Sequence, residues 1–488
     1  MNRRMIFFTV AKVLKLETVL LLLPLIVAAL YQEWNGVIAF AITCGASILS
    51  AFLLTVSAKP RTKVIYAKEG FAIATLCWIA VSVIGCLPFI ISREIPNVFN
   101  AFFETVSGFT TTGATILTDV EKMSRGMLFW RSFTHWIGGM GVLVLLMAIV
   151  PSDSGRMIHI MRAEMAGPVV DKLVPRVKET ARILYVLYFA LTACEFVLLL
   201  IGGMPVYDSA VHALGTAGTG GFGIRGDSLG SYSPYLQWVI SVFMILFGIN
   251  FNLFYFVVIG KISSAIKNTE LWIFFSMIAV SSIVIAVNIL PLYGNDFGES
   301  IRHSVFQVSS LMSTTGYSTA DFNLWPPLAK GILFILLFVG GCAGSTAGGL
   351  KISRVLILVK MILRDIRTMF HPHSVNTVMI DNKAVDNGTL HRVSTYFAIY
   401  ILLIGGTFLL ISFEPFGFET NLTAAITCVN NVGPGFGAVG PMGGYNDYSD
   451  FSTLILTIAM LFGRLEIYPI LLTLDIKSWT KPLSTAKA

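Results

Sequence analysis

Long apolar segments alternate with short polar stretches along nearly the whole chain. Ten of these segments could each cross a bilayer, which takes about 20 predominantly apolar residues in a helix. They cover residues 17–32, 37–57, 67–92, 127–150, 182–203, 234–260, 271–292, 328–363, 394–413 and 451–475. The pattern predicts a helical protein that crosses the membrane many times.

Four further stretches are only partly apolar and too short to cross the hydrocarbon core as helices. They lie near residues 98–111, 207–218, 301–314 and 419–431. Each follows a predicted external loop, runs into a glycine-containing turn and is followed by a polar stretch. We interpret each as a re-entrant helix whose chain turns back to the side from which it came.

Together these segments reveal an internal repeat of long helix, short helix, glycine turn and long helix. Aligned on one glycine, the turns read TTTGA around Gly113, AGTGG around Gly220, STTGY around Gly316 and NNVGP around Gly433. We therefore expect an all-α polytopic membrane protein with four quasi-repeated units around one central pore. Two extra transmembrane helices precede the units.

The predicted boundaries follow from this alignment. Residues 1–57 form the extra helices, 58–150 repeat 1, 151–181 a cytoplasmic loop, 182–262 repeat 2, and 263–365 repeat 3 with an intramembrane glycine-rich loop at 340–349. Residues 366–392 form a second cytoplasmic loop, and 393–488 form repeat 4 and the tail.

Glycine turns at membrane depth suggest a pathway for ions. Irregular backbone is tolerated there only where it is buried in protein or lines a watery cavity. Four such turns around one axis would present a ring of carbonyl oxygens, which can replace the hydration shell of a monovalent cation. Glycine permits the positive φ that such a backbone needs. Close helix packing is the alternative for one glycine, but it does not explain four, each after a short helix.

Composition and charge support a membrane location. The chain is 55% hydrophobic and 12% charged, whereas a soluble domain has roughly 25% charged residues. Of the 34 Lys and Arg residues, 26 fall in alternate loops that include both termini, and seven, Arg131 among them, fall in the opposite loops. The positive-inside rule then places both termini in the cytoplasm. Because this charge follows topology rather than forming one patch, we expect no nucleic-acid partner.

A glycine-rich break inside segment 328–363 is a candidate gate. Five glycines fall in ten residues, and each disfavours helix by roughly 0.8–1 kcal/mol relative to alanine. They are Gly340, Gly341, Gly344, Gly348 and Gly349, and Lys351 follows them. The alternative is close packing of a tilted helix.

Arg464 is the second gate candidate, because an ionised side chain inside an apolar segment is functional by default. Glu466 lies two residues on and faces away on a helix, so it is a poor partner. Snorkelling or a structural pair with another helix is the alternative. We favour a place on the pore axis, where the charge would repel cations.

The segments SGFTTTGAT, MSTTGYSTAD and GGCAGSTAGGLKISR resemble the Trk/Ktr/HKT potassium transporter superfamily, and the two leading helices resemble its TrkH branch. The resemblance implies that Gly113, Gly220, Gly316 and Gly433 are filter glycines. It also implies that Thr111, Thr112, Gly218, Thr219, Thr314, Thr315, Asn431 and Val432 coordinate potassium. No repeat contains the TVGYG motif of tetrameric potassium channels, so we expect weaker selectivity.

The resemblance further implies a multi-pass protein of the bacterial inner membrane, surrounded by lipid. It implies a homodimer with one pore in each protomer and a TrkA-like cytosolic nucleotide-binding regulatory ring. The glycine-rich break would obstruct the cavity when the pathway is closed. Potassium would be the transported substrate, and no cofactor bound by this chain is expected.

Three functions remain open from the sequence. The first is a gated, channel-like pathway driven by the membrane potential. The second is a secondary transporter that couples potassium to protons or sodium, which would need titratable groups beside the glycines; none flanks them. The third, a receptor or scaffold without ion flux, leaves the four turns unexplained. No catalytic constellation is recognisable, so we do not expect an enzyme.

Overall fold

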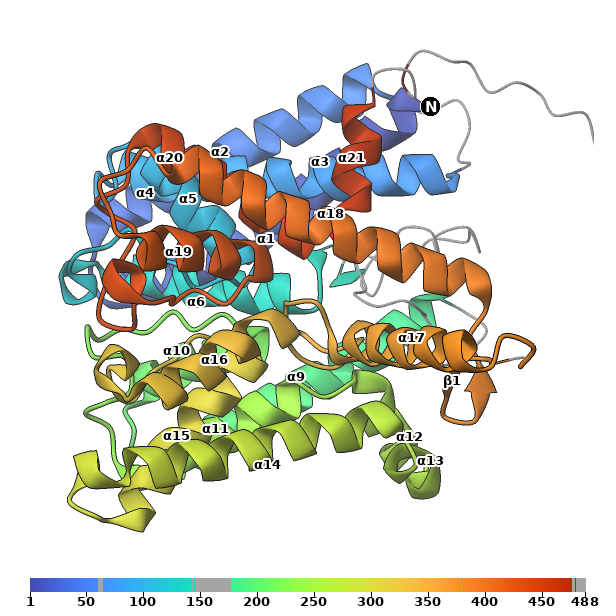
Figure 1. Cartoon of the computed structure of the whole chain (residues 1–488). Coiled ribbons are helices and arrows are strands. Elements are labelled where there is room, and N and C mark those ends of the chain that lie inside the picture. Colours follow the sequence, from blue (N-terminus) through green and yellow to red (C-terminus); the bar gives the residue numbers. More distant parts are fainter. Residues whose placement is uncertain (60–64, 143, 146–176, 375, 476–478, 480–488) are drawn as a thin grey trace, which may run out of the picture.

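The structure, a computed structural model, describes residues 1–59, 65–142, 144–145, 177–374, 376–475 and 479. Most of these residues are helical (Figure 1). Within them, β structure is limited to a two-stranded antiparallel hairpin of β1 (Met379–Ile380) and β2 (Lys383–Ala384). The all-α fold class is confirmed.

The chain begins with an antiparallel pair of long helices, α1 (Arg3–Leu30) and α2 (Trp34–Ser57). The hydroxyl of Thr18 donates to the hydroxyl of Ser47 over 2.9 Å, and that of Ser47 donates to the carbonyl of Leu14 over 3.0 Å. Small polar side chains of this kind allow helices to approach closely within a membrane. The pair stands before the repeats, as the sequence predicts.

Four units follow. Unit 1 contains α3 (Ala67–Gly85), α4 (Leu87–Ile91), α5 (Val98–Phe109), η1 (Val120–Lys122) and α6 (Arg125–Gly139); unit 2 contains α9 (Val177–Ile201), α10 (Val206–Gly218), α11 (Pro234–Phe247), α12 (Phe251–Val258) and α13 (Ile262–Ile266). Unit 3 contains α14 (Thr269–Ile289), η3 (Leu290–Tyr293), α15 (Phe297–Met312), η4 (Phe322–Leu324), α16 (Pro327–Val339) and α17 (Ile352–Phe370); unit 4 contains α18 (Asn387–Ile411), α19 (Phe418–Asn430), η5 (Gly437–Val439), α20 (Asp450–Arg464) and α21 (Tyr468–Leu474).

The four predicted re-entrant helices are α5, α10, α15 and α19, and each has between 12 and 16 residues. Side chains fix where two of them begin. Asn97 accepts from the N–H of Phe99 over 2.8 Å, and Asp296 accepts from the N–H of Gly298 over 2.7 Å. Such caps satisfy amide groups that have no partner inside the helix. All four helices end directly at a glycine turn. Because the four turns contact one another, the C-termini of the helices converge on one region.

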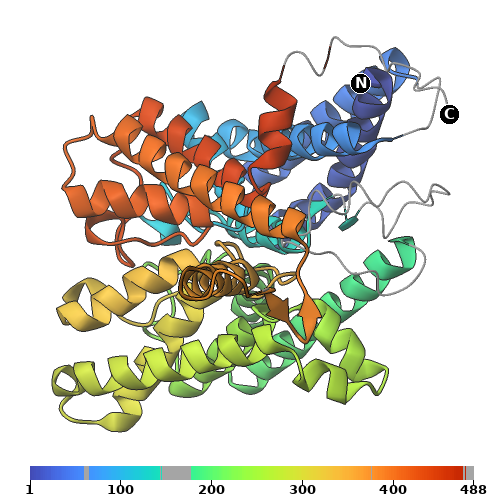
Figure 2. The same cartoon turned by 45° about the vertical axis from the view of Figure 1, so that its right-hand side comes forward.

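The units close into a ring. Each short helix packs against the second long helix of the preceding unit: α10 on α6, α15 on α11, α19 on α16 and α5 on α20. Each also packs within its own unit, on α11, α16, α20 or α6. The last unit therefore contacts the first, and Figures 1 and 2 show the red helices of unit 4 beside the cyan helices of unit 1.

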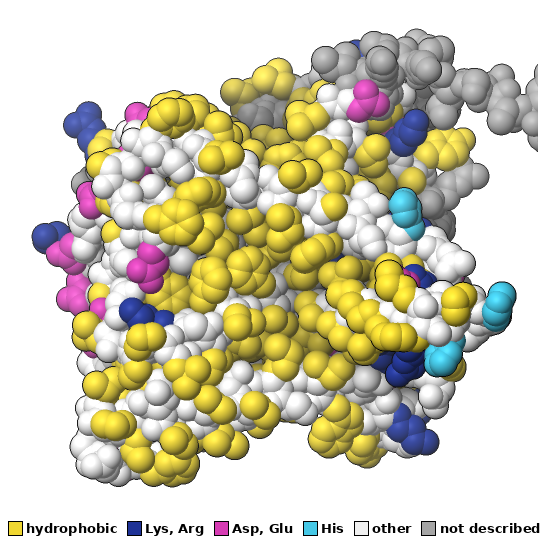
Figure 3. Space-filling model, viewed as in Figure 1, with side chains coloured by type: hydrophobic (Ala, Val, Ile, Leu, Met, Phe, Trp, Pro, Cys, Tyr) yellow, Lys and Arg dark blue, Asp and Glu magenta, His cyan; other side chains and the backbone are white. Residues whose placement is uncertain are grey.

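Apolar side chains dominate the middle of the face seen in Figure 3, and charged ones gather toward its two ends. Among the described residues, six helices are long and apolar enough to cross a membrane, or eight if each bent pair forms one span. The chain is thus a multi-pass membrane protein. The predicted segment 127–150 is helical as far as Gly139, and residues 143 and 146–150 lie outside the described part, as does most of loop 151–181.

Two predicted spans are not continuous helices. Segment 234–260 bends by 92° between α11 and α12, and segment 451–475 bends by 116° between α20 and α21. At the first bend, Asn250 caps the new helix by accepting from the N–H of Asn252 over 2.9 Å. At the second, Glu466 and Ile467 adopt φ of +58° and +65°, which no helix tolerates. The break expected in 328–363 is present between α16 and α17.

Candidate functional site: four glycine turns around one axis

The four turns share one backbone conformation. In each, two residues separated by one have positive φ: Thr111 and Gly113, Thr219 and Gly221, Thr314 and Gly316, and Asn431 and Gly433. The residue between them donates its N–H back into the short helix, from Thr112 to Ser107, Gly220 to Gly215, Thr315 to Ser310 and Val432 to Thr427, over 2.8–3.0 Å. These equivalences define the register of the repeat.

The register corrects the sequence alignment in repeat 2. Gly221, not Gly220, occupies the place of Gly113, and the pair at 220 and 221 makes the two choices indistinguishable from sequence. Gly220 corresponds to Thr112. Gly218 corresponds to Thr110 in this register, whereas the sequence alignment paired it with Thr111. It therefore lies outside the three positions assigned to the filter in the other units.

A second observation fixes the same register and closes the ring. A Cβ built on Gly113 would lie within 3.0 Å of the Gly220 carbonyl oxygen, and one on Gly221 would lie as close to that of Thr315. The next two contacts continue around the axis, from Gly316 to the oxygen of Val432 and from Gly433 to that of Thr112. Each turn therefore rests against the carbonyl of the next unit, and no side chain fits between them.

The same four glycines line one cavity. Its volume is about 120 Å³, and Gly113, Gly221, Gly316 and Gly433 all border it. Hydroxyl side chains of Thr115, Thr118, Ser228 and Ser318 also line it. We call this cavity the vestibule. It is lined by residues of all four units.

Beneath the turns lies the glycine-rich connection between α16 and α17, here called the inner loop (residues 340–351). The N–H of Gly348 donates to the Thr314 hydroxyl over 2.6 Å, and the N–H of Gly349 donates to the Asn430 carbonyl over 2.9 Å. Gly340, Gly344, Gly349 and Lys351 have positive φ, so the segment cannot be helical. The inner loop thus sits directly against the turns of units 3 and 4.

Unit 2 and helix α14 of unit 3 itself hold the inner loop from the side. The N–H of Cys342 donates to the carbonyl of Gly248 over 2.9 Å, at the bend of unit 2. The carboxylate of Glu270 accepts from the N–H groups of Ala343 and Ser353, over 2.8 and 3.0 Å. Lys351 is buried and donates to the Ala347 carbonyl inside the loop. Cys342 and Ala343 therefore fix the N-terminal part of the loop to the bend of unit 2 and to α14.

Arg464 has main-chain partners in two other units. Its guanidinium donates to the carbonyl of Thr346 in the inner loop over 3.0 Å, and to those of Gly138 and Gly139 in unit 1 over 2.6 and 2.7 Å. Glu466 pairs instead with Arg354, so the judgement that it is a poor partner for Arg464 is correct. These three hydrogen bonds of Arg464, here called the clasp, connect the inner loop to the end of α6.

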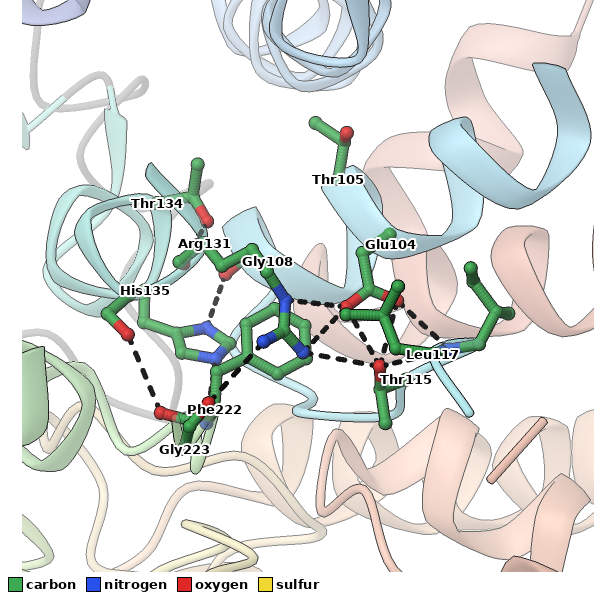
Figure 4. Close-up of polar contacts among 12 residues, drawn as sticks. Glu104, Thr105, Gly108, Thr115, Leu117, Arg131, Thr134, His135, Phe222 and Gly223 are labelled. Atoms are coloured by element: carbon green, nitrogen blue, oxygen red, sulfur yellow. Dashed lines mark hydrogen bonds and ion pairs between the residues drawn. The ribbon is translucent and has the colours of Figure 1, made fainter. Parts of the chain in front are cut away.

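A polar cluster behind the turns of units 1 and 2 was not singled out from the sequence (Figure 4). Its members are Glu104, Arg131 and His135, all fully or nearly fully buried. Arg131, counted as a loop residue in the sequence analysis, lies inside α6. A carboxylate in a short re-entrant helix and an arginine in an apolar segment are the signals that could have flagged this cluster.

His135 joins two units through backbone groups. Its Nδ1 lies 2.7 Å from the carbonyl of Gly108, so this nitrogen carries the proton and donates. Its Nε2 accepts from the N–H of Phe222 over 3.3 Å. The ring also lies where a side chain on Gly220 would have to go. Both nitrogens of a neutral imidazole are thereby used to position the turn of unit 2.

This geometry defines a pore-loop membrane protein with four non-identical units in one chain. A family model described as "TrkH: Cation transport protein" matches residues 37–481. The chain belongs to this family, which is one of transport proteins and not of enzymes.

Curated relatives and a solved structure agree with this assignment. The chain is 34% identical to "Trk system potassium uptake protein TrkG" of Escherichia coli, over 92% of this chain and 93% of the relative. It is 32% identical to TrkH of the same organism, over 94% and 95% of the two chains. The crystal structure titled "Potassium Transporter TrkH from Vibrio parahaemolyticus" matches with a TM-score of 0.87 and 29% identity, covering 98% of this chain and all of that one.

Proposed function

We propose that this chain carries potassium across a bacterial inner membrane through a gated, channel-like pore along the axis of the four turns. The closed ring of contacts between each turn glycine and the carbonyl of the next unit carries this proposal. The identity of the cation rests on relatives named as potassium uptake proteins.

The proposed filter is made of backbone and hydroxyl oxygens. In the register of the structure it comprises Thr111, Thr112, Gly113, Thr219, Gly220, Gly221, Thr314, Thr315, Gly316, Asn431, Val432 and Gly433. Carbonyl oxygens replace the hydration shell of potassium at low net cost, whether by cavity size or by the number of oxygens. Because the four turns differ in side chains, we expect selectivity below that of a symmetric tetrameric channel.

A channel-like mechanism fits the neighbourhood of the turns better than coupling to protons does. A coupled transporter needs a group that gains and loses a proton as the ion passes. One titratable side chain that packs on the proposed filter, His135, has both ring nitrogens engaged with backbone groups. Protonating it would break its bond to Phe222, so it serves position rather than proton transfer.

The proposed gate is the inner loop together with Arg464, and its residues include Gly340, Gly341, Gly344, Gly348, Gly349 and Lys351. The loop lies under two of the four turns, and Arg464 ties it to unit 1. A loop rich in glycine can adopt a second conformation with little strain. Release of the clasp would free the loop to move away from the axis.

The proposed assembly follows the family resemblance. We propose a homodimer, with one pore in each protomer, regulated by a TrkA-like cytosolic nucleotide-binding ring. We also propose that both termini and residues 366–392 face the cytoplasm, which is supported by the distribution of Lys and Arg. The repeat boundaries predicted from the sequence are part of the same proposal.

Purified protein in liposomes tests the mechanism. Reversal potentials would be measured with crossed gradients of potassium and protons, and of potassium and sodium. A channel-like pore predicts a potential that follows the potassium gradient and does not move with pH. A shift that tracks the proton or sodium gradient with a fixed stoichiometry would instead establish coupled transport.

A further inference from the structure

Glu104 of α5 and Arg131 of α6 form a buried ion pair. The Glu104 Oε1 lies 2.7 Å from both Nε and Nη2 of Arg131, and the side chains are 0% and 2% exposed. Charge-assisted bonds to the fork of a guanidinium fix both distance and orientation. The pair is therefore a rigid joint inside unit 1.

The joint holds the segment that leaves the turn of unit 1. Glu104 accepts from the N–H of Ile116 and from the Thr115 hydroxyl, each over 3.0 Å. Nη2 of Arg131 also donates to that hydroxyl over 3.2 Å. Thr115 lines the vestibule, so the pair sets the position of the outer wall next to Gly113.

Arg131 extends the joint to unit 2. Its Nη1 donates to the carbonyl of Gly223 over 3.4 Å, and its guanidinium carbon lies 4.0 Å from the centre of the Phe222 ring (Figure 4). Phe222 directly follows Gly221 in the chain. One side chain thus connects the outward segments of two adjacent turns.

Stability alone is a poor reason for such a pair, because removing two charges from water offsets most of their attraction. The other units do without it. His212, Gln307 and Ala424 hold the place of Glu104, counted back from Gly220, Thr315 and Val432. Gln307 makes one bond to the outward segment of its unit, to the Ala320 carbonyl, and the alanine makes none. The charged joint is specific to the boundary between units 1 and 2.

We infer that the Glu104–Arg131 pair is a positioning element for ion selectivity, which sets the spacing between the carbonyls of turns 1 and 2. This inference rests on the proposed function, since it presupposes that the turns are the filter. The pair also neutralises the charge of Arg131. Arg131 borders the vestibule, and an unpaired positive charge there would repel the cations that enter.

Two substitutions separate geometry from charge. Arg131→Lys keeps the positive charge but loses the planar fork that reaches Glu104, Thr115 and Gly223 together. Glu104→Gln keeps the shape but leaves Arg131 unpaired. Glu94→Gln is the matched control, since Glu94 is half-buried in the same unit and its carboxylate accepts from the hydroxyl and the N–H of Ser124, over 2.6 and 3.0 Å.

The measurement is the reversal potential under bi-ionic potassium and sodium gradients, with the three variants and the unmodified protein reconstituted in liposomes. We expect Arg131→Lys to lower the potassium-to-sodium permeability ratio by about tenfold, equivalent to about 1.4 kcal/mol. Glu104→Gln should lower both this ratio and the potassium conductance. The Glu94→Gln variant should match the unmodified protein.

Each result decides the question. An unchanged ratio in Arg131→Lys overturns the inference, even if Glu104→Gln conducts less, because the pair would then act through charge alone. Should Glu104→Gln fail to elute as a monodisperse protein, Arg131→Lys alone decides. If the unmodified protein shows no preference for potassium, the proposed function fails rather than this inference.

Discussion

The ring of turns and the inner loop beneath it are both glycine-rich backbone at membrane depth, yet they are organised differently. In the ring, every unit has positive φ at the same two positions of its turn, and the glycine at the second position lies against the carbonyl of the next unit. The inner loop belongs to unit 3 alone, and its neighbours are unlike one another: a hydroxyl, carbonyls, a carboxylate and an arginine. The proposed filter thus has equivalent oxygens from all four units, whereas the proposed gate is a single element of one unit.

The largest effect is expected where a turn glycine gains a side chain. In Gly316→Ser the new Cβ would meet the Val432 carbonyl, and the turn must open. We expect the potassium-to-sodium permeability ratio to fall by about a hundredfold, or about 2.7 kcal/mol. Gly113→Ser should behave alike. Gly331→Ser is the control, since a Cβ at this position of α16 meets nothing within 4 Å. If Gly316→Ser, Gly113→Ser and the control Gly331→Ser all have the same potassium-to-sodium permeability ratio, the ring of turns is not the filter.

Shortening the inner loop should change flux and not selectivity. Deletion of residues 344–347 removes the part that Arg464 holds through Thr346 but retains Gly348 and Gly349, which contact the turns. We expect potassium flux to rise about tenfold, as a barrier lower by about 1.4 kcal/mol gives. Tracer uptake into liposomes measures it. A variant that is monodisperse and conducts at the unmodified rate would show that the obstruction lies within the ring itself.

Loss of the clasp should have a smaller effect of the same kind. Arg464→Ala removes three bonds to carbonyls of Thr346, Gly138 and Gly139. Potassium flux should rise about threefold, which is about 0.7 kcal/mol, with an unchanged permeability ratio. Arg464→Lys keeps the charge without the fork, so it separates the clasp from simple repulsion. Combined with the loop deletion, Arg464→Ala should add little, because both act on one constriction.

The smallest effect on transport is expected from a substitution that reports only the orientation of the chain in the membrane. It should leave transport unchanged. A cysteine at Asn382, at the tip of the β1–β2 hairpin, should resist an impermeant external thiol reagent in intact cells and react after lysis. The same substitution in a background without Cys194, the exposed native cysteine, controls for reaction elsewhere. Labelling from outside would invert the proposed orientation.

The sequence predicts the parts of this architecture that depend on local physics. A helix too short to cross the membrane, followed by a glycine, is visible in the pattern of residues, and so is the break at 340–349. The register of repeat 2 is not, because Gly220 and Gly221 both satisfy a glycine-based alignment. Their backbone conformation and contacts in the folded chain separate them.

Features that depend on distant contacts were beyond the sequence. The bends at Asn250 and Glu466 occur in segments whose apolar character continues across the break. The partners of Arg464 are main-chain carbonyls of α6 and the inner loop. Every residue has such a carbonyl, so the sequence does not indicate which ones accept a hydrogen bond. Arg131 and Glu104 look like isolated charges until the fold brings α5 and α6 together.

The ring of oxygens can be tested directly by locating bound ions. Crystals of the protein grown in thallium or rubidium, both of which substitute for potassium, would be measured near an absorption edge of the ion. The account predicts an anomalous peak on the axis of the turns, surrounded by the carbonyl oxygens of Thr112, Gly220, Thr315 and Val432. A well-ordered ring without a peak, with the ion bound elsewhere in the molecule, would contradict it.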